Sequence, residues 1–236
     1  MELTILGRYG PLPAAGGATS AYCVASAGTR ILLDFGTGAL SRTGGGLSGV
    51  VADAIVLSHL HYDHIADIFP LSYAPESGRP PLYLPRTDCP QRRLIDTLGF
   101  SIHDIGHGSE VEIGRLRLAF YAVRHPIECY AVSVTDGKDT LFYTGDTVYF
   151  DELSSYAAGC GLILADGAQD PDGKPTPHMT LKDTARLRDR TGVRTLVTHV
   201  SPAFAPESAA DALSLEVVRE GAVYRVGAPG AGSARR

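Results

Sequence analysis

The chain has 236 residues, of which 44% are hydrophobic and 20% are charged, and its formal net charge is −5. These values are typical of a globular protein with one sizeable domain of the α/β or sandwich class. They disfavour a nucleic-acid-binding protein, which usually carries a basic stripe, and no apolar run approaches the roughly 18 residues of a membrane span.

The first segment and the cysteines indicate the compartment. Residues 3–6 are apolar and predict a first strand, without the basic region and long apolar core of a signal peptide. The four cysteines are scattered, with no Cys-x-x-Cys spacing. This spacing disfavours a disulfide framework or a zinc ribbon and favours a reducing compartment. We therefore expect a cytoplasmic protein with no membrane partner.

A strand pair is predicted at residues 20–25 and 29–34, with a turn at Ala27 and Gly28 between them. The second strand ends at Asp34. One interpretation of this carboxylate is that it orients a metal-ligating histidine without touching the metal. The other interpretation is an ordinary turn or capping residue. The sequence leaves both open.

A dense cluster of metal-ligand side chains follows residues 54–57, an apolar run that predicts a buried strand. The cluster reads Ser58-His59-Leu60-His61-Tyr62-Asp63-His64, and residues 65–69 after it predict a helical turn. Three imidazoles and a carboxylate are thus expected at a strand end, where rigid scaffolds present reacting groups. Imidazole and carboxylate together suit zinc and neighbouring transition metals. The cluster therefore predicts a metal site.

The remaining elements are predicted from apolar periodicity and turn residues. Strands are expected at residues 81–85, 109–113, 116–123, 130–134, 140–143, 161–165 and 194–198, and helices at 90–98, 151–158, 181–191 and 209–213. Residues 215–218 and 222–226 are expected to pair as a last hairpin, and residues 227–236 to form a disordered tail. His103 and His107 fall outside every motif and are expected at the surface.

The pattern His-x-His-x-Asp-His after a strand resembles the signature of the metallo-β-lactamase fold superfamily. Three further motifs match in the expected order, and they supply His125, Asp146 and His199. The resemblance implies an α/β fold, the four-layer αββα sandwich, in a single domain over residues 1–226. Residues 10–18, rich in Gly and Pro, would then border the site; a merely flexible loop is the other interpretation.

The resemblance also implies a dinuclear metal site and assigns its ligands. One ion would be held by His59, His61 and His125, the other by Asp63, His64 and His199, and Asp146 would bridge them. The expected cofactors are two divalent ions, zinc first, with manganese or iron as alternatives. Two such ions polarise a phosphoryl or acyl oxygen and lower the pKa of a shared water. The resulting hydroxide is then the nucleophile, and Asp63 is expected to be catalytic as well as a ligand.

The segment His178-Met179-Thr180, ahead of a predicted helix, looks like a motif of the ribonuclease Z branch. It implies that His178 acts catalytically at the scissile phosphate, by protonating the leaving alkoxide or binding a phosphate oxygen; the alternative is a structural residue beside the helix. Ribonuclease Z proteins carry a tRNA-gripping arm between the positions matching His125 and Asp146. Here that interval has only 21 residues, so we expect no tRNA or other nucleic-acid substrate.

The expected function is a dinuclear metal-dependent phosphodiesterase that acts on a small phosphodiester, for example a cyclic nucleotide. The first alternative is a metal-dependent acyl hydrolase whose substrate is a thioester, a lactone or another intermediate of a biosynthetic pathway. A binding or regulatory module that retains metal without turnover is a further alternative, but all seven ligand positions match. The expected partner is a small-molecule substrate, and a homodimer is the assembly suggested by the families that the chain resembles.

Overall fold

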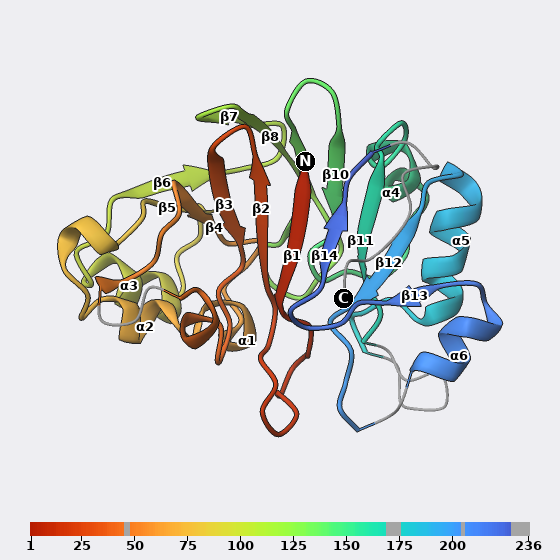
Figure 1. The fold of residues 1–236 in the computed structure, drawn as a ribbon, viewed down its shortest axis with the longest axis horizontal. Helices are drawn as coiled ribbons and strands as arrows, with labels where there is room; N and C mark the ends of the chain where they lie inside the picture. The colour runs from red at the N-terminus through yellow and green to blue at the C-terminus, as the bar shows by residue number, and fades with distance from the viewer. Residues whose placement is uncertain (45–47, 169–175, 204–205, 228–236) are drawn as a thin grey trace.

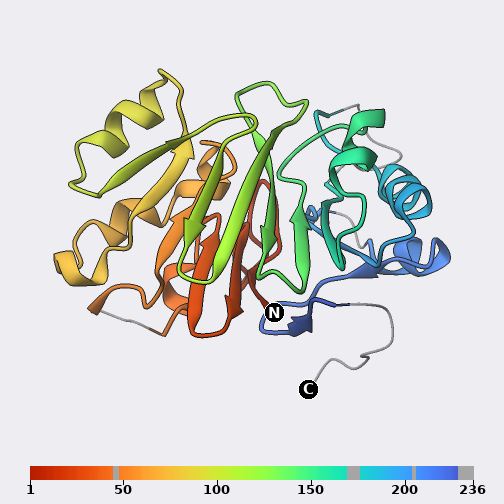
Figure 2. The same ribbon diagram turned by 90° about the horizontal axis from the view of Figure 1, so that it is seen from above.

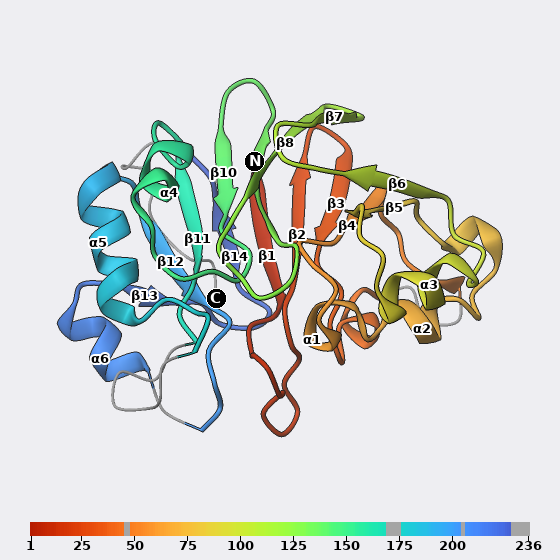
Figure 3. The ribbon, with the colours of Figure 1, turned by 180° about the vertical axis from the view of Figure 1, so that it is seen from behind.

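Two β-sheets packed face to face form the centre of the molecule, and helices cover their outer faces (Figures 1 and 2). The computed structural model describes residues 1–44, 48–168, 176–203 and 206–227. The helices of the first half of the chain lie on one side of the sandwich, and those of the second half lie on the other (Figure 3). This arrangement confirms the predicted α/β fold with four layers.

Each sheet has seven strands among the described residues. The first sheet runs in the order β14 (Val223–Arg225), β1 (Glu2–Gly7), β2 (Ala21–Ser26), β3 (Thr29–Leu33), β4 (Ala54–Val56), β5 (Leu82–Pro85) and β6 (Ile102–Ile105). The second runs in the order β13 (Glu216–Val217), β12 (Thr195–Thr198), β11 (Leu162–Asp166), β10 (Thr140–Tyr143), β9 (Tyr130–Thr135), β8 (Leu116–Ala122) and β7 (Glu110–Ile113). Strands β3 and β4 are parallel, as are β10, β11 and β12. Parallel strands bring their carboxyl ends to one sheet edge, where α/β folds usually bind ligands.

Short helices shield the outer faces of both sheets. They are α1 (Tyr62–Ile65), α2 (Ile68–Leu71), α3 (Pro90–Asp96), α4 (Asp151–Tyr156), α5 (Leu181–Thr191) and α6 (Glu207–Ala212), with single 3-10 turns at Leu40–Arg42 and Glu76–Gly78. Ile65 and Leu71 pack against the outer side of the first sheet, and Leu153 and Leu187 against that of the second. None of the helices described here is long and apolar enough to cross a membrane.

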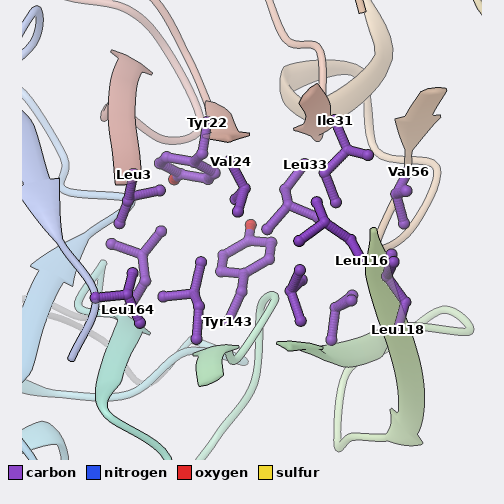
Figure 4. Packing of buried hydrophobic residues seen from close by; sticks show 14 of the residues in the cluster. Leu3, Tyr22, Val24, Ile31, Leu33, Val56, Leu116, Leu118, Tyr143 and Leu164 are labelled. Atoms are coloured by element: carbon purple, nitrogen blue, oxygen red, sulfur yellow. The ribbon is translucent and has the colours of Figure 1, made fainter. Parts of the chain in front are cut away.

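The core between the sheets is built by alternate residues of the strands, as expected for strands with one face buried. Figure 4 shows Val24 and Leu33 of the first sheet above Leu164 and Leu118 of the second. Two tyrosines cross this core with ring centroids 5.1 Å apart, Tyr22 and Tyr143. Their hydroxyls reach Thr198 Oγ1 at 2.9 Å and Asp34 Oδ2 at 2.7 Å respectively. The core is therefore tied by hydrogen bonds to the polar strand ends.

Helix α5 illustrates how local sequence fixes the elements near those strand ends. Thr180 and Asp183 form a reciprocal capping box at its start, which satisfies backbone donors that the first helical turn leaves open. The helix ends at Gly192, which adopts φ +68° and so allows the left-handed cap that other residues disfavour. The predicted helix at residues 181–191 is confirmed, and its cap fixes the chain just after His178.

The last two strands do not pair with each other, so the prediction of a final hairpin at residues 215–218 and 222–226 is wrong. Strand β13 pairs in parallel with β12, and β14 pairs antiparallel with β1, so the chain crosses between sheets. An isolated two-stranded hairpin is marginal in water, whereas each sheet edge offers a strand that is already packed. The amide of Gly221, in the crossing, donates to the carbonyl of Ile5 at 2.8 Å.

Other boundaries differ in smaller ways. Strand β6 was not predicted, because its sequence Ile102-His103-Asp104-Ile105 lacks the alternation of a half-buried strand. The helical turn predicted at residues 65–69 begins earlier, at Tyr62, and is interrupted before Ile68. Apart from Gly227, the predicted disordered tail at residues 227–236 lies outside the described residues.

Candidate metal centre

The polar side chains singled out in the sequence converge at one edge of the sandwich. The cluster at residues 58–64 follows β4, His125 follows β8, Asp146 follows β10 and His199 follows β12. This edge lies at the bottom of Figure 1, where α1 and the loop after β1 are seen. Segments that are far apart in the chain thus place their imidazoles and carboxylates together at this edge.

The first group of facing donors comprises His59, His61, His125 and Asp146, whose ligand atoms all lie within 4.8 Å of one another. Nδ1 of His61 lies 3.1 Å from Nε2 of His59 and 3.1 Å from Nε2 of His125. The Nε2 atom of His59 is 3.5 Å from Asp146 Oδ2. Ligands around a tetrahedral zinc ion, with bonds of about 2.0–2.1 Å, stand about 3.3 Å apart. The spacing of these donors therefore fits one such ion.

The second group comprises Asp63, His64 and His199. Oδ2 of Asp63 lies 3.6 Å from Nε2 of His64 and 3.7 Å from Nε2 of His199. The same two nitrogens lie 3.2 and 3.3 Å from Asp146 Oδ2. Asp146 therefore faces both groups, which is the placement that a carboxylate needs to bridge two ions.

Two buried atoms of the cluster have no hydrogen-bond partner in the described part of the chain, Nε2 of His64 and Oδ1 of Asp146. A buried polar atom without a partner is costly. Burial raises the pKa of Asp146 to about 6, although the charge of His64 opposes this shift. Burial also lowers the pKa of His59 and of His199 well below the usual value. The carboxylates around His64 have the opposite effect and raise its pKa well above the usual value. Imidazoles gathered around a buried carboxylate are a donor set that a divalent cation satisfies.

Asp34 is fully buried and contacts this cluster through His64 and Ser58. Its Oδ2 lies 2.8 Å from Nδ1 of His64, and it also accepts the hydroxyl of Tyr143 at 2.7 Å. Oδ1 and Oδ2 accept the backbone amide and the hydroxyl of Ser58, at 2.7 and 2.9 Å. Engaging Nδ1 of His64 leaves its Nε2 to face Asp146, which is how carboxylates usually hold metal-binding histidines. The contact with His64 is the one that the first interpretation of Asp34 requires, and we propose that role for it.

His178 stands beside the second group and is held by a carboxylate that was not predicted. Its Nδ1 lies 2.8 Å from Oδ2 of Asp166, and its ring stacks on that of His199 with centroids 5.1 Å apart. Burial lowers the pKa of His178, but the charge and hydrogen bond of Asp166 outweigh burial and raise this pKa to about 9. His178 also forms a group of facing ligand atoms with Asp146 and His199. Asp166 is the last residue of the buried strand β11, and Asp34 and Asp146 follow buried strands. A carboxylate at the end of an apolar run is therefore a signal that could have revealed Asp166.

His199 itself is held by the chain that follows β1. Its φ of +54° is rare for a residue other than glycine. The amide of Val200 donates to the carbonyl of Arg8 at 2.9 Å, and the amide of Gly10 donates to the carbonyl of Val200 at 3.2 Å. Ser20 Oγ lies 2.9 Å from Nδ1 of His199. A Cβ on Gly10 would stand only 2.1 Å from Cε1 of His199, so the backbone passes directly against the imidazole.

A cavity of about 410 Å³ opens above these donors. Its lining comprises Pro11, His61, Tyr62, Asp63, His125, Asp146, Pro177, His178 and His199. The volume is that of a site for a small molecule. Larger hollows of about 780 and 680 Å³ contain none of the predicted site residues. His103 and His107 are exposed and lie outside the site, as predicted.

Comparison with known proteins agrees with this architecture. A family model described as a β-lactamase superfamily domain matches residues 29–199. The probable metallo-hydrolase YhfI of Bacillus subtilis is 33% identical over 215 residues, which cover 85% of this chain and 87% of that protein. The crystal structure of YhfI covers 95% of this chain and 99% of its own, with a TM-score of 0.86 and 28% identity.

Two more distant proteins share the architecture. Ribonuclease Z of Mycobacterium bovis is 27% identical over 255 residues, covering 87% of this chain and 88% of its own. The crystal structure of a diphosphatase from the PhnP family covers 94% of this chain and 96% of its own, with a TM-score of 0.74. At 21% identity, the latter likeness shows the fold alone. The chain therefore belongs to the β-lactamase superfamily, and its fold and histidine cluster are those of a metal-dependent hydrolase.

Proposed function

We propose that the protein is a dinuclear metal-dependent hydrolase whose substrate is a small phosphodiester, cyclic phosphodiesters included. The observation that carries this proposal is the position of Asp146, whose Oδ2 stands within 3.5 Å of ring nitrogens from both donor groups. A pair of His178 and Asp166 beside the same cavity adds a proton donor for the leaving group.

The chain's own donors divide between two ions. His59, His61 and His125 would hold one ion, Asp63, His64 and His199 the other, and Asp146 both. Five imidazoles and two carboxylates favour zinc, with manganese or iron as alternatives. Two divalent ions held by these residues would polarise a phosphoryl oxygen and lower the pKa of a shared water. Asp63, which lines the cavity as well as facing His64 and His199, would also orient that water.

His178 supplies the proton for the leaving group in this proposal. Asp166 engages Nδ1, so Nε2 is the ring nitrogen left for the substrate. The proton on Nε2 moves to the ester oxygen as its bond to phosphorus breaks, because an alkoxide is a poor leaving group until it is protonated. Asp166 is itself fixed by the backbone amides of Thr147 and Ala168, at 3.1 and 2.9 Å. His178 therefore keeps one orientation.

The size and charge of the molecule favour a small substrate. The interval between His125 and Asp146 is filled by β9 and β10, and a net charge of −5 offers little attraction for nucleic-acid phosphates. A cavity of about 410 Å³ suits a molecule of mononucleotide size. The four cysteines are free thiols, which supports our proposal of a reducing, cytoplasmic location.

A substrate panel tests the proposed function. The metal-loaded protein is assayed on bis(4-nitrophenyl) phosphate and cyclic mononucleotides, and in parallel on thioesters, lactones and nitrophenyl esters. We expect kcat/KM to be highest for a phosphodiester and to collapse in Asp146→Ala. Faster turnover of acyl compounds throughout would instead favour the acyl hydrolase.

A further inference from the structure

The cavity has a polar floor and an apolar rim. The imidazoles and carboxylates form the floor, whereas Pro11, Tyr62 and Pro177 supply apolar lining from three separate segments. Seven large hydrophobic residues are exposed in the described part of the chain. Three of these, Leu12, Tyr62 and Ile127, line the cavity or lie within two residues of its lining along the chain. Exposed apolar side chains that gather at a polar site usually contact a ligand.

Of these three residues, Tyr62 is the one that lies within the segment of metal-ligand side chains. It lies between His61 and Asp63, and it begins helix α1. Asp63 is 9% exposed and His64 is fully buried, whereas Tyr62 is 65% exposed. Its hydroxyl makes no hydrogen bond among the described residues, and most of its side chain faces solvent. The same stretch of backbone thus directs Asp63 and His64 inward and presents the ring of Tyr62 at the mouth of the cavity.

We propose that Tyr62 is a specificity-determining residue that stacks on an aromatic ring of the substrate, such as a nucleobase. The proposal rests on the proposed function and narrows it to phosphodiesters of nucleosides or similar aryl compounds. A tyrosine ring offers a flat face at low entropic cost, and every nucleobase has a complementary face. A cavity of about 410 Å³ accommodates one sugar phosphate with one base at its mouth.

Ligand binding tests this proposal without relying on turnover. Adenosine 5′-monophosphate, ribose 5-phosphate and hexyl phosphate are titrated into the zinc-loaded protein by calorimetry. We expect adenosine monophosphate to bind about 5- to 150-fold more tightly than ribose phosphate, as one base–aromatic stack provides. Tyr62→Ala should abolish that preference while metal content stays at the parental value, and Tyr62→Phe should restore it. Tyr73→Ala is the matched control, because Tyr73 is 92% exposed and does not line the cavity.

Other results of these titrations would overturn either the role of Tyr62 or the proposed function. An adenosine preference that survives in Tyr62→Ala, or its absence from the parent protein, would overturn the role of Tyr62. Hexyl phosphate could instead bind as tightly as adenosine monophosphate, with Tyr62→Leu restoring the affinity that Tyr62→Ala loses. The substrate group that contacts residue 62 would then be an alkyl chain rather than an aromatic ring, and the proposal would be overturned. Failure of the proposed function can be told apart from failure of the role of Tyr62. In that case no phosphodiester is hydrolysed, but the parent protein still prefers adenosine monophosphate and Tyr62→Ala still loses that preference.

Discussion

Gly10→Ala is expected to weaken binding of one ion of the proposed dinuclear site, although it replaces none of the ligands. The added Cβ would stand 2.1, 2.2 and 2.4 Å from Cε1, Nε2 and Nδ1 of His199. Non-bonded carbon atoms prefer about 3.5 Å, so either the imidazole or the backbone must move by more than about 1 Å. The backbone resists, because hydrogen bonds at 2.9 and 3.2 Å join Arg8 and Gly10 to Val200. A metal–ligand bond tolerates only about 0.2 Å.

The expected cost has two measurable parts. Overpacking of this kind lowers the free energy of unfolding by about 1–3 kcal/mol, which urea titration of the metal-free protein measures. Affinity for the second ion should fall by at least about 10–100-fold, the loss typical when a ligand's support is disturbed, and competition with a chromogenic chelator measures it. Gly106→Ala is the control, since a Cβ there meets nothing within 4 Å. If Gly10→Ala binds two ions with parental affinity, the account of how His199 is held is wrong.

Three other substitutions or substrates give independent checks. Asp34→Ala leaves donors of His64, Ser58 and Tyr143 without their buried acceptor, so the free energy of unfolding should fall by about 3 kcal/mol or more; an unchanged urea midpoint would contradict this role. His178→Ala should lower kcat by about 10²–10⁴-fold for an alkoxide leaving group but much less for nitrophenolate, with metal content retained. Loss of an ion in that variant would show that His178 is a metal ligand instead. Its ligand atom does lie near those of Asp146 and His199. Precursor tRNA should not be processed at physiological salt, and efficient cleavage would refute the inferred substrate size.

The sequence was most informative where one short segment carries several donors. His59, His61, Asp63 and His64 follow a single buried strand, so strand geometry alone places them together. His125, Asp146 and His199 were found only through resemblance to a family, because nothing local distinguishes a lone strand-end histidine or aspartate from a structural one. The structure brings all seven side chains to the same edge.

The contacts that were missed depend on the tertiary fold. Asp166 contacts His178 because residue 178, twelve positions later in the chain, lies beside the end of β11. The periodicity of apolar residues in the sequence does not predict such a contact. Ser20 and Gly10 contact His199 across nearly the whole length of the chain. Strands β13 and β14 were paired wrongly for the same reason, since their apolar patterns fit a hairpin as well as two separate sheet edges.

Metal stoichiometry is the decisive test of the proposed dinuclear site. The freshly purified protein, and the chelated protein after reconstitution with zinc, are analysed by plasma mass spectrometry against protein concentration. We expect two ions per chain, and one or none in Asp146→Ala, because that carboxylate faces both donor groups. A reproducible absence of metal, with no uptake on reconstitution, or an Asp146→Ala protein that retains both ions and full activity, would contradict it.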